Sequence, residues 1–393
     1  MVNKEQIQAL SKLPSPILSA YLRIVPDDAS QHTLEPASLR WLRKEATSLA
    51  ETLVSDQLTL FRAQLDRALE FLRGRTLHEK SIILFAGPEA WETVSLQVAV
   101  KSELHWGKPA ISQLLWLAAE HRPYCIVAVD RAGVRFFSYQ LKELRQVHET
   151  KFDVDISQWG RKDMGHVARP GIQKTYGSQR DVFDHRMEAQ YQRICRETSR
   201  KAIQLYGQYH FSGIFLVGSE RLIAPIASEF PAELQRHVVA IKKDLGNFDL
   251  RSLRTHIEPE IEKWEGEHEM AQVGDLLGEK HGAILGIGET LARLQNRELR
   301  ALLLCSDFDP RLHRCSNCGW IDFSGDPFCS VCRGEWTDVT LCGVLPGLVV
   351  ASEADVCIVS GEAATRLKEA GGIGAWVRLP KQRAIRRLIA RAS

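Results

Sequence analysis

Two Cys-x-x-Cys pairs constrain the fold of this chain more than any other feature of its sequence. The first pair is Cys315 and Cys318, the second is Cys329 and Cys332, and ten residues separate the pairs. Four thiolates at this spacing suit a tetrahedral Zn²⁺ ion and leave no coordination position open for catalysis. The segment 313–336 is therefore predicted to be a zinc ribbon that holds a structural zinc ion. A metal-free remnant of a ribbon and a redox role for the thiols are the alternatives.

The composition narrows the class of protein. A chain of 393 residues that is 44% hydrophobic can form two or three globular domains. Its nine cysteines are an odd number, and the paired ones suit metal binding, so a cytoplasmic location is expected. No stretch resembles a signal peptide or approaches the ~20 apolar residues of a membrane helix, so no membrane partner is expected. The net charge is only +2, so nucleic-acid binding would need a local excess of basic residues.

Hydrophobic periodicity predicts strands and helices in alternation, which indicates an α/β fold. We predict three domains, at 1–120, 121–250 and 251–393. The second should begin with a three-stranded meander, because three strand-like runs follow one another with a short turn between them. The predicted helices cover 39–72, 111–119, 182–207, 222–230, 251–280 and 361–372, and the predicted strands include 80–87, 91–100, 124–130, 135–140, 141–153, 211–219, 237–246 and 355–360.

The segment 159–201 is the most unusual part of the chain. Up to residue 180 it is rich in Gly and basic residues and lacks apolar periodicity, which predicts a long loop. Loops longer than about 12–15 residues tend to be functional or disordered. Ten basic and five acidic residues give the segment a charge of +5, which points to a phosphate backbone; a solvated loop and helix face is the alternative. The basic residues are Arg161, Lys162, Arg169, Lys174, Arg180, Arg186, Arg193, Arg196, Arg200 and Lys201.

The loop is predicted to end in the tripeptide Gly177, Ser178 and Gln179, which we call the glutamine tip. Glycine adopts backbone angles closed to other residues and permits a close approach to another surface. The amide of Gln179 both donates and accepts hydrogen bonds and carries no charge. Such a group cannot act as a strong base, but it can orient a water molecule at an activated ester.

The chain resembles the archaeo-eukaryotic class I peptide chain release factor family, including its Pelota-type relatives and bacterial counterparts. The meander YCIVAVDRAGVRFF, the basic loop with its glutamine tip, the following helix and FSGIFLVGS occur in the order of the family's middle domain. The segments GAILGIGETLARL and GGIGAWVRL resemble the family's third domain, in which archaeal members also carry a zinc-bearing insert. The resemblance implies an RNase H-like middle domain and a C-terminal α-β-α sandwich of the kink-turn RNA-binding type.

The resemblance also implies an activity. In the family, a Gly-Gly-Gln tip enters the peptidyl transferase centre and hydrolyses peptidyl-tRNA, with the glutamine positioning water and the ribosome and the tRNA 2′-OH supplying the rest. Matched by position, Gly177, Ser178 and Gln179 would form this tip, with Ser178 as in tRNA-hydrolysing relatives of ribosome quality control. Residues 1–120 contain neither the Asn-Ile-Lys-Ser motif nor the aromatic-cysteine motif of stop-codon decoding. Rescue of stalled ribosomes is therefore the expected function.

The implied partners are the large ribosomal subunit with its rRNA and peptidyl-tRNA, and a translational GTPase is a further candidate. The predicted RNA contacts come from the loop and the start of the helix. A non-catalytic Pelota-like rescue factor and an RNase H-fold nuclease acting on tRNA through Asp153 and Asp155 are the alternative functions. His166, His185 and the basic tail 381–391 are weaker candidates for RNA contacts. The predicted RNA-binding residues are Arg161, Lys162, Arg169, Lys174, Arg180 and Arg186.

Overall fold

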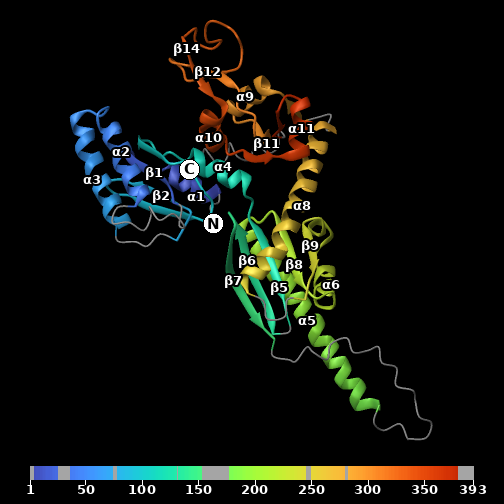
Figure 1. Cartoon of the computed structure of the whole chain (residues 1–393). Coiled ribbons are helices and arrows are strands. Elements are labelled where there is room, and N and C mark those ends of the chain that lie inside the picture. Colours follow the sequence, from blue (N-terminus) through green and yellow to red (C-terminus); the bar gives the residue numbers. More distant parts are fainter. Residues whose placement is uncertain are drawn as a thin grey trace, which may run out of the picture. The chain divides into compact units, whose positions relative to one another are not determined.

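The fold is taken from a computed structural model, which describes residues 4–24, 36–73, 78–130, 132–152, 177–244, 249–278 and 282–378, with the side chains of 177–188 excluded. The chain forms two compact units (Figure 1). One unit spans Arg122–Lys263, and the other combines Val2–His121 with Trp264–Ser393. The mixed α/β class is confirmed, and the division into three domains stays a prediction. No helix in the described ranges is both long and apolar enough to cross a membrane.

The N-terminal part contains a four-stranded antiparallel sheet in the order β3-β2-β1-β4. Buried side chains of β1 and β2 form a core with two helices, α2 and α3, where the sequence predicted one helical stretch over 39–72. The stretch is interrupted after Ala50, where Thr52 Oγ1 donates to the carbonyl oxygen of Leu49 and turns the chain. The elements are α1 (Lys4–Ser11), β1 (Ile17–Arg23), α2 (Ala37–Ala50), α3 (Ser55–Arg73), β2 (Ser81–Ala86), β3 (Trp91–Leu96), β4 (Glu103–Gly107) and α4 (Ser112–Glu120).

The unit Arg122–Lys263 contains a five-stranded sheet in the order β7-β6-β5-β8-β9. The first three strands form the predicted antiparallel meander, whereas β5, β8 and β9 run parallel. Every residue of β5 and β8 is buried, as expected for central strands covered on both faces. The elements are β5 (Tyr124–Val129), β6 (Gly133–Gln140), β7 (Glu143–Lys151), α5 (Gly177–Tyr209), β8 (Gly213–Gly218), α6 (Glu220–Ser228), α7 (Ala232–Gln235) and β9 (Val238–Lys242).

The long helix α8 (Leu250–Gly278) contributes residues to both units. Within the first unit, Glu258 accepts hydrogen bonds from the hydroxyl of Tyr139 at 2.7 Å and from Nε of Arg254 at 2.6 Å. Burial alone would raise the pKa of Glu258, but the bonds from Arg254 and Tyr139 outweigh it and lower that pKa. A carboxylate kept ionised in this way ties the start of α8 to β6.

The C-terminal part contains a second four-stranded sheet, ordered β10-β16-β11-β15, with α8 and α11 packed on its core. A separate three-stranded sheet, β13-β12-β14, is inserted between β11 and α10 (Figure 1); we call residues 311–340 the cysteine-rich insert. The sequence did not predict α10, because Gly343 and Pro346 suggest a break, but burial of Leu345 and Val349 outweighs this weak propensity. The elements are β10 (Ala283–Leu285), α9 (Ile287–Gln295), β11 (Leu299–Cys305), β12 (Arg311–Cys315), β13 (Ile321–Asp322), β14 (Trp336–Thr340), α10 (Leu341–Ser352), β15 (Asp355–Val359), α11 (Gly361–Glu369) and β16 (Ile373–Val377).

Candidate functional site

The C-terminal half of α5 is fixed to the sheet by one buried face. Cys195, Ala202 and Leu205 are buried against the side chains of β5 and β8, at steps of seven and three residues. The hydroxyl of Tyr191 donates to the carbonyl oxygen of Arg221 at 2.8 Å, which joins α5 to α6. Helical periodicity predicted the burial of Ala202 and Leu205 but not of Cys195, and the buried face gives α5 a rigid attachment.

The opposite face of α5 is basic and exposed. Arg193, Arg196 and Arg200 all lie on it. Arg193 pairs with Glu197 at 2.8 Å, one turn further along the helix, and such an exposed pair adds little stability. Arg196 and Arg200 are one turn apart, so their guanidinium groups extend the positive charge along the helix. This face can therefore approach a polyanion without disturbing the buried side of α5.

The glutamine tip lies in the first turn of α5, because the helix begins at Gly177. The prediction that the helix begins near residue 182 is wrong by about one turn. Apolar periodicity starts only at Phe183, so the pattern gave no signal for the preceding residues. At 1.5 Å per residue, Gly177 is about 21 Å along the helix axis from Tyr191. Figure 1 shows this end of α5 running beyond the sheet.

The start of a helix has a chemical character of its own. The first backbone N–H groups have no intrahelical acceptor, and the helix dipole places partial positive charge there. Both features favour a phosphate or a developing oxyanion.

Several predicted site residues fall outside the described part of the structure. Arg161, Lys162, Arg169 and Lys174 lie there, as do Asp153, Asp155, His166 and the tail 381–391. The backbone of Ser178, Gln179, Arg180, His185 and Arg186 belongs to α5, but their side chains are not described. The roles of these side chains stay predictions.

The four predicted metal-ligand cysteines come together in the cysteine-rich insert. The sulfur atoms of Cys315, Cys318, Cys329 and Cys332 all lie within 4.8 Å of one another. The separation is 3.4 Å between Cys315 and Cys332 and 3.6 Å between Cys318 and Cys329. Four sulfurs bound tetrahedrally at about 2.3 Å from one ion would be about 3.8 Å apart. The cluster is therefore compatible with zinc in both chemistry and size.

The two Cys-x-x-Cys pairs share one backbone geometry. In each pair the N–H of the first cysteine donates to the carbonyl oxygen five residues later, and its own carbonyl oxygen accepts from the N–H four residues later. The fourth residue after the cysteine has a positive φ in both cases, 74° at Gly319 and 61° at Arg333. The hydrogen bonds join Cys315 N to Trp320 O (2.8 Å), Gly319 N to Cys315 O (3.0 Å), Cys329 N to Gly334 O (3.0 Å) and Arg333 N to Cys329 O (2.9 Å).

The surroundings of the sulfur atoms also suit a thiolate site. The backbone N–H of Cys318 donates to Sγ of Cys315 and is the largest of several contacts that lower the pKa of that thiol. A Cβ atom at Gly334 would lie 2.9 Å from Sγ of Cys315 and 3.3 Å from Sγ of Cys332. Only a glycine leaves this side of the cluster open, so the backbone is shaped around the four sulfurs.

Gln295 holds the insert against α9, a role that the sequence gave no sign of. Its amide nitrogen donates to the carbonyl oxygen of Ile321 at 2.8 Å, and its amide oxygen accepts from the N–H of Ile321 at 2.8 Å. Both backbone groups of this β13 residue are thus satisfied by a single side chain.

Gln295→Ala is expected to leave both backbone groups of Ile321 without a protein partner, at a cost of about 1–3 kcal/mol. We expect faster hydrogen exchange at the Ile321 amide and faster proteolysis within the insert. Arg293→Ala is the matched control, because Arg293 lies on the same helix but pairs with Glu289 and Glu298. Equal protection of Ile321 in both variants would contradict a role for the Gln295 amide.

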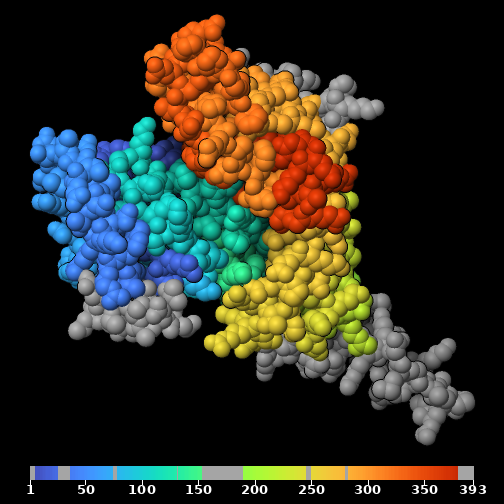
Figure 2. All heavy atoms as spheres, turned by 45° about the horizontal axis from the view of Figure 1, so that its top comes forward, coloured from blue at the N-terminus to red at the C-terminus, as the bar shows by residue number. Residues whose placement is uncertain are grey.

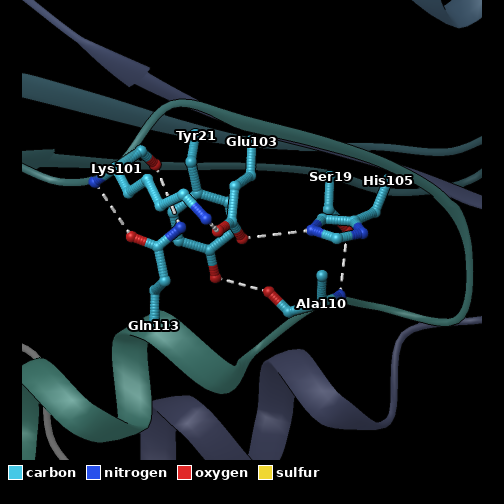
Figure 3. A network of polar contacts seen from close by, with 7 residues as sticks. All are labelled: Ser19, Tyr21, Lys101, Glu103, His105, Ala110 and Gln113. Atoms are coloured by element: carbon cyan, nitrogen blue, oxygen red, sulfur yellow. Dashed lines mark hydrogen bonds and ion pairs between the residues drawn. The ribbon is translucent and has the colours of Figure 1, made fainter. Parts of the chain in front are cut away.

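A polar network joins β1 and β4 to α4 (Figure 3). Tyr21 donates from its hydroxyl to the carbonyl oxygen of Ala110, and Gln113 bonds both backbone groups of Lys101, at 3.0 and 3.1 Å. Glu103 pairs with Lys101 at 3.2 Å and with His105 at 3.3 Å. Burial acts to raise the pKa of Glu103, but bonds from His105, Gln113 and Lys101 outweigh it and lower that pKa.

Glu103→Gln is expected to lower the free energy of unfolding at neutral pH by about 1 kcal/mol, because the partly exposed carboxylate loses its ion pair with Lys101. A lowered folded-state pKa means that this stability is complete above the unfolded-state value of about 4.3 and is lost as the pH falls below it. Urea unfolding at a series of pH values should therefore show the difference between variant and wild type shrinking below about pH 4. Glu92→Gln, an exposed carboxylate on β3, is the control. A difference that does not change with pH would contradict the lowered pKa.

Comparison with known proteins gives a family match for the unit that carries α5. The family described as bacterial archaeo-eukaryotic release factor family 10 matches residues 109–253. Curated proteins gave no match to the chain. The solved structures that it resembles include the archaeal translation termination factor aRF1, at 14% identity over 95% of this chain and 96% of that one, with a TM-score of 0.25.

Two Pelota structures are also similar. Archaeoglobus fulgidus Pelota matches at 13% identity, over 76% of this chain and 79% of that one, with a TM-score of 0.29. A ribosome-bound archaeal Pelota with ABCE1 matches at 10% identity, over 95% and 94% of the two chains, with a TM-score of 0.39. TM-scores this low carry no argument about function, so the assignment depends on the family match, which includes β5 to β9 and the glutamine tip. Residues 109–253 of the chain are therefore similar to bacterial archaeo-eukaryotic release factor family 10.

Proposed function

We propose that this protein is a translation release or ribosome rescue factor that hydrolyses the ester bond of peptidyl-tRNA on stalled ribosomes. The match of residues 109–253 to a release factor family carries the proposal, because the matched segment contains the glutamine tip. The ribosome, its large-subunit rRNA and peptidyl-tRNA are the proposed partners, and a translational GTPase is a further one.

The fold supports the proposal in two respects. The sheet order β7-β6-β5-β8-β9, with three antiparallel strands followed by parallel ones, supports an RNase H-like assignment for the middle unit. The C-terminal sheet, with helices packed on it, supports an α-β-α sandwich of the kink-turn RNA-binding type. The zinc ribbon of this proposal is formed by Cys315, Cys318, Cys329 and Cys332, and the zinc ion has a structural role only.

In the proposed reaction, Gln179 acts by position rather than by proton transfer. Its uncharged amide orients the attacking water, and the backbone N–H groups at the start of α5 face the oxygen on which negative charge develops. The buried face of α5 holds the far end of the helix on the sheet, so the glutamine tip is carried on a rigid element. Arg161, Lys162, Arg169, Lys174, Arg180 and Arg186 contact RNA phosphates in this scheme.

A second candidate is a rescue factor that binds the ribosome without catalysis. Ser178 favours it, since serine narrows the backbone freedom that a second glycine would allow. In this version, the basic face of α5 binds rRNA and the glutamine tip has no chemical role. The nuclease alternative depends on Asp153 and Asp155, which lie outside the described residues.

The test uses purified protein and stalled ribosome–nascent chain complexes that lack a stop codon. We expect peptide release at least tenfold faster than spontaneous hydrolysis. Co-sedimentation with the ribosome but no release would identify the second candidate. The absence of both ribosome binding and peptide release would contradict the proposed function.

A further inference from the structure

The cysteine-rich insert exposes large apolar side chains at its outer loops. Phe323, Phe328 and Val331 are 49%, 51% and 62% exposed. They account for three of the seven exposed large hydrophobic residues in the described part of the chain, and they fall within nine residues of one another. Scattered exposed apolar residues need no explanation, but a local group of them, with two aromatic rings, is typical of an interaction surface.

The backbone beneath these side chains is held in place. Asp322 accepts hydrogen bonds from the N–H groups of Phe323 at 2.7 Å and Ser324 at 3.1 Å. The indole N–H of Trp336 donates to the carbonyl oxygen of Asp326 at 2.9 Å. Phe328 directly precedes Cys329 in the cysteine cluster. The apolar side chains are therefore presented on a fixed loop, which lowers the entropic cost of binding.

The charge around the apolar group is negative. Residues 311–340 contain three arginines, no lysine and four acidic residues. A zinc ion bound by four thiolates adds a charge of about −2, so the loaded insert carries about −3. Two acidic residues, Asp326 and Glu335, and one basic residue, Arg333, are exposed close to the apolar group in the sequence, so the acidic residues are in excess there. An RNA backbone would be repelled by this surface, whereas a protein surface rich in Lys and Arg would be attracted.

We propose that Phe323, Phe328 and Val331 form a docking surface for a basic protein on the ribosome, with the two aromatic rings as anchors and Asp326 and Glu335 at the rim. This inference rests on the proposed function, because it takes the ribosome as the partner. It assigns the insert a second role besides folding: the insert contacts ribosomal protein, while the basic face of α5 contacts RNA.

The binding test compares three proteins in co-sedimentation with purified ribosomes. The triple variant Phe323→Ser, Phe328→Ser and Val331→Ser is expected to bind at least tenfold more weakly than wild type. The double variant Val54→Ser and Leu60→Ser removes exposed apolar groups elsewhere and should bind normally. Zinc content and circular dichroism confirm that the triple variant keeps the insert folded. Asp326→Lys reverses a charge at the rim and should also weaken binding. The loop should keep its structure in this variant, because Trp336 bonds only the backbone carbonyl oxygen of Asp326.

A photocrosslinking residue at position 328 identifies the class of partner. An adduct with a ribosomal protein that survives ribonuclease treatment supports the proposal. An adduct only with rRNA or with a second copy of this chain overturns it, as does wild-type binding by the triple variant. If the wild-type protein itself fails to bind ribosomes, the proposed function fails and this inference falls with it, an outcome distinct from the others.

Discussion

Gln179→Ala is expected to slow peptide release on stalled ribosomes by at least ~100-fold while leaving ribosome affinity within about twofold. A group that positions the attacking water contributes mainly to the transition state, and losing such a contribution typically lowers the rate by 10²–10³. Alanine keeps the helical start of α5 and carries no charge, so RNA binding by the basic residues should persist. The measurement is single-turnover release of labelled peptide from purified stalled complexes.

The controls for Gln179→Ala lie on the same helix. Gln208→Ala removes an exposed glutamine near the other end of α5 and should release peptide at the wild-type rate. Ser178→Gly restores the Gly-Gly-Gln pattern of the family that the sequence resembles and should remain active. Release by Gln179→Ala at the wild-type rate would remove Gln179 from the reaction.

Strands and helices with a buried face could be predicted from the sequence, because burial leaves a period in the residue pattern. The meander and the buried face of α5 are examples, since β5 is a continuous apolar run and α5 repeats apolar residues at helical steps. The edge strand β4 was missed, because only Leu104 and Trp106 mark it and no residue in it is fully buried. The start of α5 was predicted too late in the chain for a similar reason. The first turn of the helix does not pack on the sheet, so it has no apolar periodicity.

The residues of the candidate site also differ in whether they leave a pattern in the sequence. The four cysteines could be predicted because a metal demands a fixed ligand spacing that is visible in the sequence. Gln295 could not, since its partner Ile321 is 26 residues away and any backbone group can accept an amide. Phe323, Phe328 and Val331 carried a weak signal, as apolar residues in a segment rich in Gly, Asp and Pro, but only the structure shows that each of them is exposed.

Cys318→Ser is expected to reduce the zinc content from one ion per chain to a small fraction and to unfold the cysteine-rich insert. A structural zinc site with four thiolates contributes roughly 10–16 kcal/mol, so one ligand accounts for about 3 kcal/mol, more than a hundredfold in affinity. The insert has a small core, chiefly Leu312, Ile321 and Cys329, and units below ~40 residues usually need a metal or disulfides to fold. Zinc analysis and limited proteolysis within 311–340 provide the measurements.

The matched control for Cys318→Ser is Cys342→Ser, because Cys342 lies two residues after the insert and outside the cluster of four sulfurs. It should keep one zinc ion and wild-type proteolysis. Since Cys318 is exposed, a chelator should reach the ion without global unfolding, so EDTA should reproduce the proteolysis pattern of Cys318→Ser. The C-terminal sheet should survive both treatments, because its core of Leu303, Cys305 and Leu367 does not include the insert. Full zinc occupancy in Cys318→Ser would exclude the four-thiolate site, and loss of the whole C-terminal fold on chelation would mean that the ion stabilises more than the insert.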